Sequence, residues 1–189
     1  MSNINNPPMW DEIETITKDI DFSASAEEDV TIDIGGYTKE ILRGRIYIDV
    51  DPGAGFSQWA TITFYNKNAK HGNDVIFRTY HLFVYTELEV ATTGSDNEIT
   101  PDAHEDFTPH GLVVILDTTD EFCRIATVAD SLLAEDDPAV HAIDQGVCTV
   151  AEFSGFSLYN NESDTDVECR ITFGSAQSVS LKMELLVRR

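Results

Sequence analysis

Hydrophobic residues recur at every second position along most of the chain after residue 22. Such alternation of apolar and polar side chains is the pattern of a β-strand with one buried face. The cleanest example lies at residues 179–187, where every odd position is apolar. We predict about nine strands, at residues 30–34, 46–50, 60–64, 75–90, 111–116, 122–129, 147–159, 167–173 and 179–187.

The longest apolar run, residues 75–90, reads VIFRTYHLFVYTELEV and departs from this alternation. Its middle is apolar on both faces, so we expect it to be central in a two-layer fold or to be covered from outside its own domain. It is longer than an ordinary strand, which predicts a bend or bulge near Arg78–Tyr80. Phe83 and Tyr85, close to its end, are predicted to contact a neighbouring subunit.

Residues 1–22 lack the alternating pattern and are interpreted as an N-terminal arm, followed by one domain over residues 23–189. Pro8 favours the first turn of a short helix over residues 9–18. Trp10, Ile13 and Ile16 would lie on one face of this helix. Since so short a helix is unstable alone, these three residues are predicted to form an interface.

Two long connections separate the predicted strands. Residues 91–110 form a polar stretch longer than most structureless loops, which indicates a functional or contact role. Residues 131–136, within the second connection at 131–146, are expected to form one helical turn that ends before Pro138. Both segments are candidate contact elements.

Strand count and helix scarcity predict an all-β fold, a two-sheet jelly-roll β-sandwich with an N-terminal arm containing a short helix. An immunoglobulin-like sandwich is the alternative. It normally shows a tryptophan between two cysteines, whereas Trp10 and Trp59 both precede the first cysteine, Cys123.

The chain carries 34 acidic and 12 basic residues, a formal net charge of −22. Such a surface repels nucleic acids and anionic lipids, so no nucleic-acid partner is expected. Many acids with few lysines are typical of halophilic proteins, in which molar salt screens the self-repulsion. No apolar segment is long enough to span a membrane, and the first residues do not resemble a secretory signal. We therefore expect no membrane insertion.

No catalytic motif or cofactor fingerprint is present, and the protein is predicted not to be an enzyme. Three widely spaced cysteines are interpreted as small buried hydrophobes. The histidines show no HxH pair of the kind that metal-dependent jelly-roll enzymes use. Asp164 and Asp166 flank a predicted turn and are weak candidates for a Ca²⁺ site; no catalytic, cofactor-binding or other metal residues are predicted.

In size, charge and strand pattern, the chain resembles the smaller single-jelly-roll capsid proteins of icosahedral, internal-membrane viruses that infect halophilic archaea. This resemblance implies upright jelly rolls that form pseudo-hexagonal capsomers with a second, larger capsid protein above a membrane vesicle. It implies homo- and hetero-oligomeric assembly through the arm and loops, synthesis in the host cytoplasm and a place in the virion.

Three other functions stay open at this stage. The first is a tail, spike or decoration β-sandwich of a tailed virus. The second is a carbohydrate-binding module that stacks sugars on Trp59, Tyr65 and Phe83. The third is a hydrolase whose acid pair is assembled in space rather than in sequence.

Overall fold

The computed structural model describes residues 13–33, 40–53, 55–66, 75–158 and 166–188. These residues are all-β, as predicted, and none of them forms a helix. The strands are β1 (Ile13–Asp33), β2 (Glu40–Val50), β3 (Ser57–Asn66), β4 (Val75–Val90), β5 (Glu98–Pro101), β6 (Leu112–Leu116), β7 (Glu121–Val128), β8 (Leu132–Ala134), β9 (Gly146–Ser157) and β10 (Asp166–Arg188). Within the described ranges, no helix is therefore long and apolar enough to cross a membrane.

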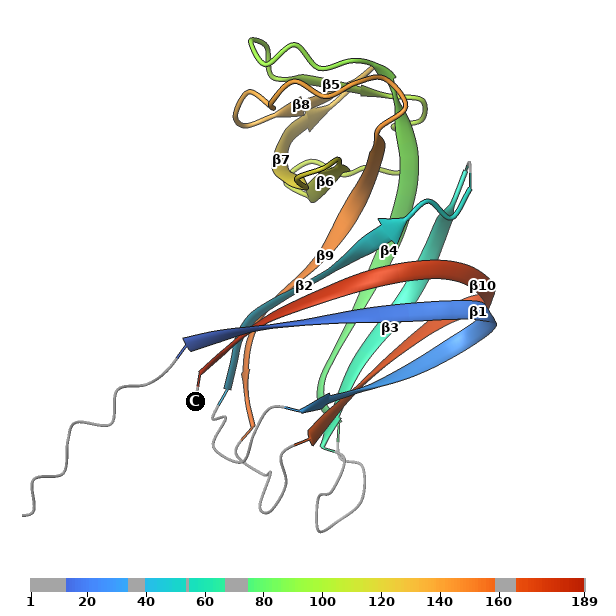
Figure 1. Cartoon of the computed structure of the whole chain (residues 1–189), viewed down its shortest axis with the longest axis vertical. Helices are drawn as coiled ribbons and strands as arrows, with labels where there is room; N and C mark the ends of the chain where they lie inside the picture. Colours follow the sequence, from blue (N-terminus) through green and yellow to red (C-terminus); the bar gives the residue numbers. More distant parts are fainter. Residues whose placement is uncertain (1–12, 34–39, 54, 67–74, 159–165, 189) are drawn as a thin grey trace, which may run out of the picture.

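All ten strands belong to one antiparallel sheet that closes in a ring (Figure 1). Its order is β1-β10-β2-β9-β6-β7-β8-β5-β4-β3, with further pairings of β10 with β3 and of β9 with β4. The expected separation into two sheets is not found, because β4 and β9 hydrogen-bond over residues 85–87 and 146–148 and join the layers.

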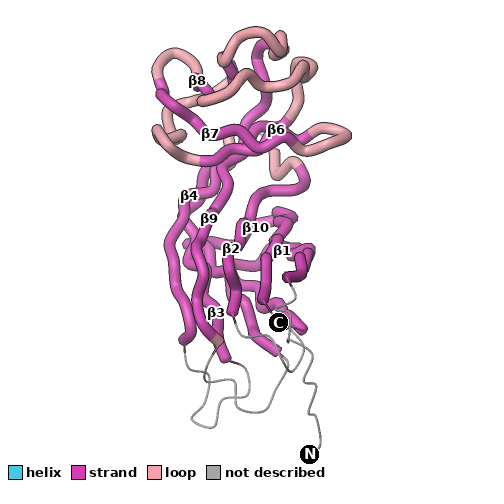
Figure 2. The backbone as a smooth tube through the Cα atoms, turned by 90° about the vertical axis from the view of Figure 1, so that its left-hand side faces the viewer, coloured by secondary structure: helices cyan, strands magenta, loops and turns pink. Residues whose placement is uncertain are grey.

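The β4–β9 pairing divides the ring into two lobes that share these two strands (Figures 1 and 2). The lower lobe consists of β1, β2, β3 and β10 with the adjoining parts of β4 and β9. The upper lobe consists of β5 to β8 with the remaining parts of β4 and β9. The upper lobe is thus made by the segment that connects β4 to β9.

The predicted helix is wrong for residues 13–18, which form the start of β1 and pair with β10. A strand places Ile13 and Ile16 on opposite faces. Ile16 is partly buried against the core, followed on the same face by the buried Ile20 and Phe22, whereas Ile13 is 56% exposed. The first isoleucines are spaced as in a helix, although the segment as a whole has the period of two of a strand. The strand also crosses the boundary expected between arm and domain at residue 22, and Trp10 lies outside the described residues.

β1 and β10 both bend, and the two halves of β10 have different neighbours. Ala24 has a φ of 53°, and the β1–β10 register shifts between Ser23 and Glu27. The first half of β10 pairs with β3, and the second half pairs with β2. This ribbon wraps across the lower lobe (Figure 1).

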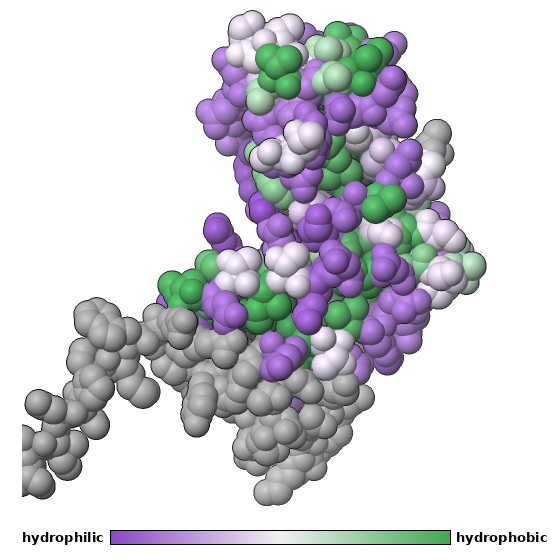
Figure 3. All heavy atoms as spheres, viewed as in Figure 1, coloured by the Kyte–Doolittle hydropathy of each residue, from purple (hydrophilic) through white to green (hydrophobic). Residues whose placement is uncertain are grey.

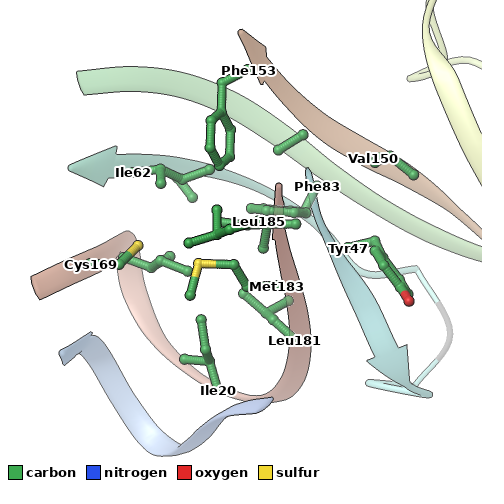
Figure 4. Packing of buried hydrophobic residues seen from close by; sticks show 14 of the residues in the cluster. Ile20, Tyr47, Ile62, Phe83, Val150, Phe153, Cys169, Leu181, Met183 and Leu185 are labelled. Atoms are coloured by element: carbon green, nitrogen blue, oxygen red, sulfur yellow. The ribbon is translucent and has the colours of Figure 1, made fainter. Parts of the chain in front are cut away.

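Each lobe has its own hydrophobic core, and β4 contributes to both. The lower core contains Phe83 and Tyr85, while the upper core contains Val84 and Leu88. Figure 4 shows Phe83 among lower-core residues from β2, β9 and β10. Burial of such side chains contributes roughly 1.5–3 kcal/mol each. Two cores explain why β4 is apolar on both faces; the irregularities in its pairing lie near its ends and not at Arg78–Tyr80.

The two long connections are more structured than the sequence indicates. The stretch 91–110 contains β5 and buries Ile99 and Phe107, so it is not a purely polar loop. Residues 132–134 form β8 in place of the expected helical turn. The three cysteines are free and buried, which confirms their interpretation as core residues.

Candidate functional site

A notch of about 610 Å³ lies between the two lobes on the described part of the protein. The outer faces of β2, β9 and β10 form its floor, and the β6–β7 hairpin overhangs it. Figure 3 shows the outline hollowed between the upper lobe and the ends of β1, β2 and β10. The notch therefore lies where the shared strands pass from one lobe to the other.

Arg43, Arg45 and Arg124 line this notch, a concentration of cations in a chain with only 12 basic residues. The Arg45 guanidinium bonds to Glu184 at 2.5 Å and lies 3.5 Å from the centroid of the Phe122 ring. Both contacts fix its position, and stacking of a guanidinium on an aromatic face is itself favourable.

Arg124 and Arg43 differ in their freedom to bind a ligand. The Arg124 guanidinium bonds to the Glu152 carboxylate at 2.7 Å and donates to the His110 carbonyl at 2.9 Å. Arg43 is exposed, and no carboxylate of the described residues lies within ion-pair distance of it. Arg43 is therefore the cation that is available to an incoming anionic group.

Gly44 lines the floor of the notch and packs directly against the core. The Phe153 ring lies so close that a Cβ on Gly44 would be 2.1 Å from its Cε2 atom. The notch also has an apolar lining beside its arginines, formed by Phe153 and Leu185 and by the overhanging Phe122 and Leu112. The lining thus combines guanidinium donors with aromatic and aliphatic surface.

Polar contacts tie the lobes together next to the notch. The Tyr47 hydroxyl, on β2, donates to Glu184 at 3.2 Å and lies 3.4 Å from an Asp120 oxygen in the upper lobe. The Tyr47 ring packs edge-on against Phe122, and burial raises the pKa of Tyr47 above its usual range. These contacts hold the hairpin over the floor.

His141 forms a second polar cluster, within the upper lobe. Its Nδ1 lies 3.1 Å from Asp117 and its Nε2 lies 2.5 Å from Glu121, and its backbone N–H donates to the Thr92 hydroxyl at 2.7 Å. The Thr118 backbone N–H, and then His141, lower the pKa of Asp117.

This cluster fastens the segment that precedes β9 to the turn between β6 and β7. Nothing in the spacing of residues 117, 121 and 141 points to it, because the contact is made across the lobe. Among the described residues, no group of three or more ligating side chains is arranged to hold a metal ion.

The three rings proposed to stack sugars do not come together. Trp59 is 66% exposed, Tyr65 is half-buried with the Arg170 guanidinium 5.4 Å from its ring centroid, and Phe83 is fully buried. A different pair of rings faces outward. Trp59 pairs with Leu82 and Thr61 with Tyr80, which places Trp59 and the 67% exposed Tyr80 diagonally on one face.

The remaining predicted site residues are dispersed. Phe83 and Tyr85 are 0% and 5% exposed inside the lower lobe, because the strand that carries them is covered by both lobes, so they do not offer a surface patch. Asp166 begins β10 opposite Asp33, whereas Asp164 lies outside the described residues.

The notch is the site best suited to binding. Its free arginine favours a carboxylate, and its aromatic and aliphatic lining favours an apolar or aromatic group beside that carboxylate. Comparison with protein-family models, with curated proteins and with solved structures finds no match to this chain.

Proposed function

We propose that this protein is a structural virion component, a capsid subunit that assembles with copies of itself and with a second capsid protein. The observation that carries the proposal is the order of strand pairing. The two halves of the bent β1 and of the bent β10, counted separately and together with β2, β3, β4 and β9, number eight. Eight is the strand number expected of a jelly roll.

Their pairings follow the jelly-roll scheme. The first half of β1 pairs with the second half of β10, which pairs with β2, which pairs with β9. The second half of β1 pairs with the first half of β10, which pairs with β3, which pairs with β4. When the eight segments are numbered in chain order, the first group has the order 1-8-3-6 and the second group has the order 2-7-4-5. This is the order of a folded double Greek key.

In this scheme, the upper lobe is an insertion between the fifth and sixth strands. It extends the molecule along one axis (Figure 2), which suits an upright subunit that packs side by side with its neighbours over a membrane vesicle. The net charge of −22 fits a virion of a halophilic host and argues against a nucleic-acid partner.

Sedimentation and electron microscopy of the purified full-length chain in molar KCl test this proposal. We expect discrete ring-shaped oligomers or larger shells that form in a concentration-dependent manner. A chain that stays monomeric up to millimolar concentration in molar KCl would contradict it. Oligomers in the form of fibres or trimeric spikes would favour the tail or spike alternative.

A carbohydrate-binding role is a second candidate, favoured by the outward Trp59 and Tyr80 rings. Neighbouring exposed aromatic faces on a sheet suit sugar stacking. Binding on a glycan array that is lost in Trp59→Ala and in Tyr80→Ala, but kept in Val140→Ala, would support it. Val140 is a suitable control because it is equally exposed, at 71%, in the other lobe.

A further inference from the structure

We infer that the notch binds residues 9–12 of a neighbouring copy of this chain, with Asp11 or Glu12 facing Arg43 and Trp10 packing on the apolar lining. This inference rests on the proposed assembly function and names the contact through which it occurs.

The chemistry of the segment matches that of the notch. Residues 9–12 read Met-Trp-Asp-Glu, two apolar side chains followed by two carboxylates. Arg43 is a solvent-exposed cation without a carboxylate partner among the described residues, and Phe122, Leu112 and Phe153 lie near it in the lining. Many surface segments of this protein supply carboxylates, but Trp10 and Trp59 are its two tryptophans, and Trp59 is held on β3.

The position of the chain end favours a neighbouring copy as donor. Thr15 lines the rim of the notch, and β1 continues past it to Ile13, still paired with β10 at Arg188. The first described residues of β1 therefore extend beyond the rim of the notch and not into it. Twelve extended residues reach roughly 40 Å, enough to cross to an adjacent subunit.

Fluorescence anisotropy with a labelled peptide of residues 1–14 tests the inference on the full-length chain in which Trp10, Asp11 and Glu12 are replaced by alanine. We expect saturable binding that is about tenfold weaker in Arg43→Ala, the usual cost of one charge-assisted hydrogen bond. Arg78→Ala is the matched control, since Arg78 is an exposed arginine on β4 outside the notch. Equal loss in both variants, or no loss in either, would overturn the assignment to the notch.

The peptide can be altered to separate its two contacts. Trp10→Ala should weaken binding at every salt concentration, because apolar contacts are not screened. The effect of Arg43→Ala should shrink between the lowest KCl that keeps the chain folded and 3 M KCl, where the Debye length falls below about 3 Å. A peptide whose binding is insensitive to Trp10→Ala would refute the proposed packing.

Two further outcomes distinguish the donor and the parent proposal. If the intact chain is monomeric and does not bind the peptide, its own residues 9–12 occupy its notch. A neighbouring copy is then ruled out as the donor. If oligomers form normally with Arg43→Ala, the notch contact fails while the assembly function stands. If the peptide binds as expected but no oligomer forms, the notch is retained and the capsid proposal fails.

Discussion

Phe83 and Val84 are adjacent on β4, yet their side chains lie in different hydrophobic cores. The alternation of a strand sends Phe83 into the lower lobe and Val84 into the upper lobe. Because one strand serves both, we expect Phe83→Ala to lower the free energy of unfolding by about 3–5 kcal/mol and to destabilise the upper lobe as well. Hydrogen exchange of amides in β6 and β7, with urea unfolding, measures both effects.

Val84→Ala is the matched substitution on the other face. It should also lower the midpoint of one common unfolding transition, although by less, because fewer methyl groups are removed. Two separate transitions, each sensitive to only one of the substitutions, would show that the lobes unfold independently.

Gly44 is predicted to be intolerant of any side chain. An added Cβ would lie 2.1 Å from Phe153 and 2.8 Å from Leu185, both packed in the core. We expect Gly44→Ala to cost about 1–3 kcal/mol, as overpacked cores do.

Gly174→Ala is the control for this substitution, because nothing lies within 4 Å of the Cβ it would gain. Its thermal midpoint should equal that of the unaltered protein or exceed it slightly, through reduced entropy of the unfolded chain. Equal stability of both alanine variants would show that Phe153 moves aside at little cost.

His81 is predicted to make stability depend on pH. Burial lowers its pKa from 6.5 to about 4, and its Nε2 lies 3.3 Å from the Thr149 hydroxyl. The unfolded chain therefore binds a proton at a higher pH than the folded chain does. The contribution of neutral His81 to the free energy of unfolding is fully present above pH 6.5. It is lost as the pH decreases toward 4, by up to about 1.4 kcal/mol per pH unit.

His81→Gln should remove this part of the pH dependence while leaving the part due to carboxylates. Unfolding in urea at pH 7.5, 6.0 and 5.0 in constant 3 M KCl measures the difference. Parallel losses in the two proteins across this range would show that His81 is protonated in the folded state.

The strand pattern predicted most of the lower lobe, because its strands have one buried face each. Residues 179–187 and 46–50 alternate cleanly and are strands in the structure. Residues 13–18 are harder to predict, because Ile13 and Ile16 fit helical spacing while Ile16, Ile20 and Phe22 fit the period of a strand. Long-range pairing with β10 decided that segment, and no local signal reports it.

The notch was not predictable from the sequence for a related reason. Arg43, Arg45 and Arg124 are far apart along the chain and come together only because the β6–β7 hairpin overhangs β2. The sequence shows that basic residues are scarce, but the clustering of these three arginines depends on the order of strands in the sheet. Phe83 and Tyr85 are predicted from the sequence to contact a neighbouring subunit, but both are buried in the lower core because their strand is shared by the two lobes.

The acidic surface leads to the last prediction, that stability rises with salt. The 34 acids outnumber the 12 bases, and one cation can serve several acids: Arg170 bonds to both Asp29 oxygens at 2.6 and 2.7 Å and lies 3.4 Å from Glu27. Exposed pairs of this kind contribute about 0–1 kcal/mol, too little to offset repulsion among the remaining carboxylates.

Molar KCl screens both the attraction of these pairs and the repulsion among carboxylates. Because the repulsion is the larger of the two, the folded state becomes more stable. The thermal midpoint should therefore increase markedly between 0.1 M and 3 M KCl, and in 0.1 M KCl the free energy of unfolding should be smallest. Identical thermal midpoints in the two solutions would mean that the net negative charge does not destabilise the folded state, and this would contradict the halophilic interpretation.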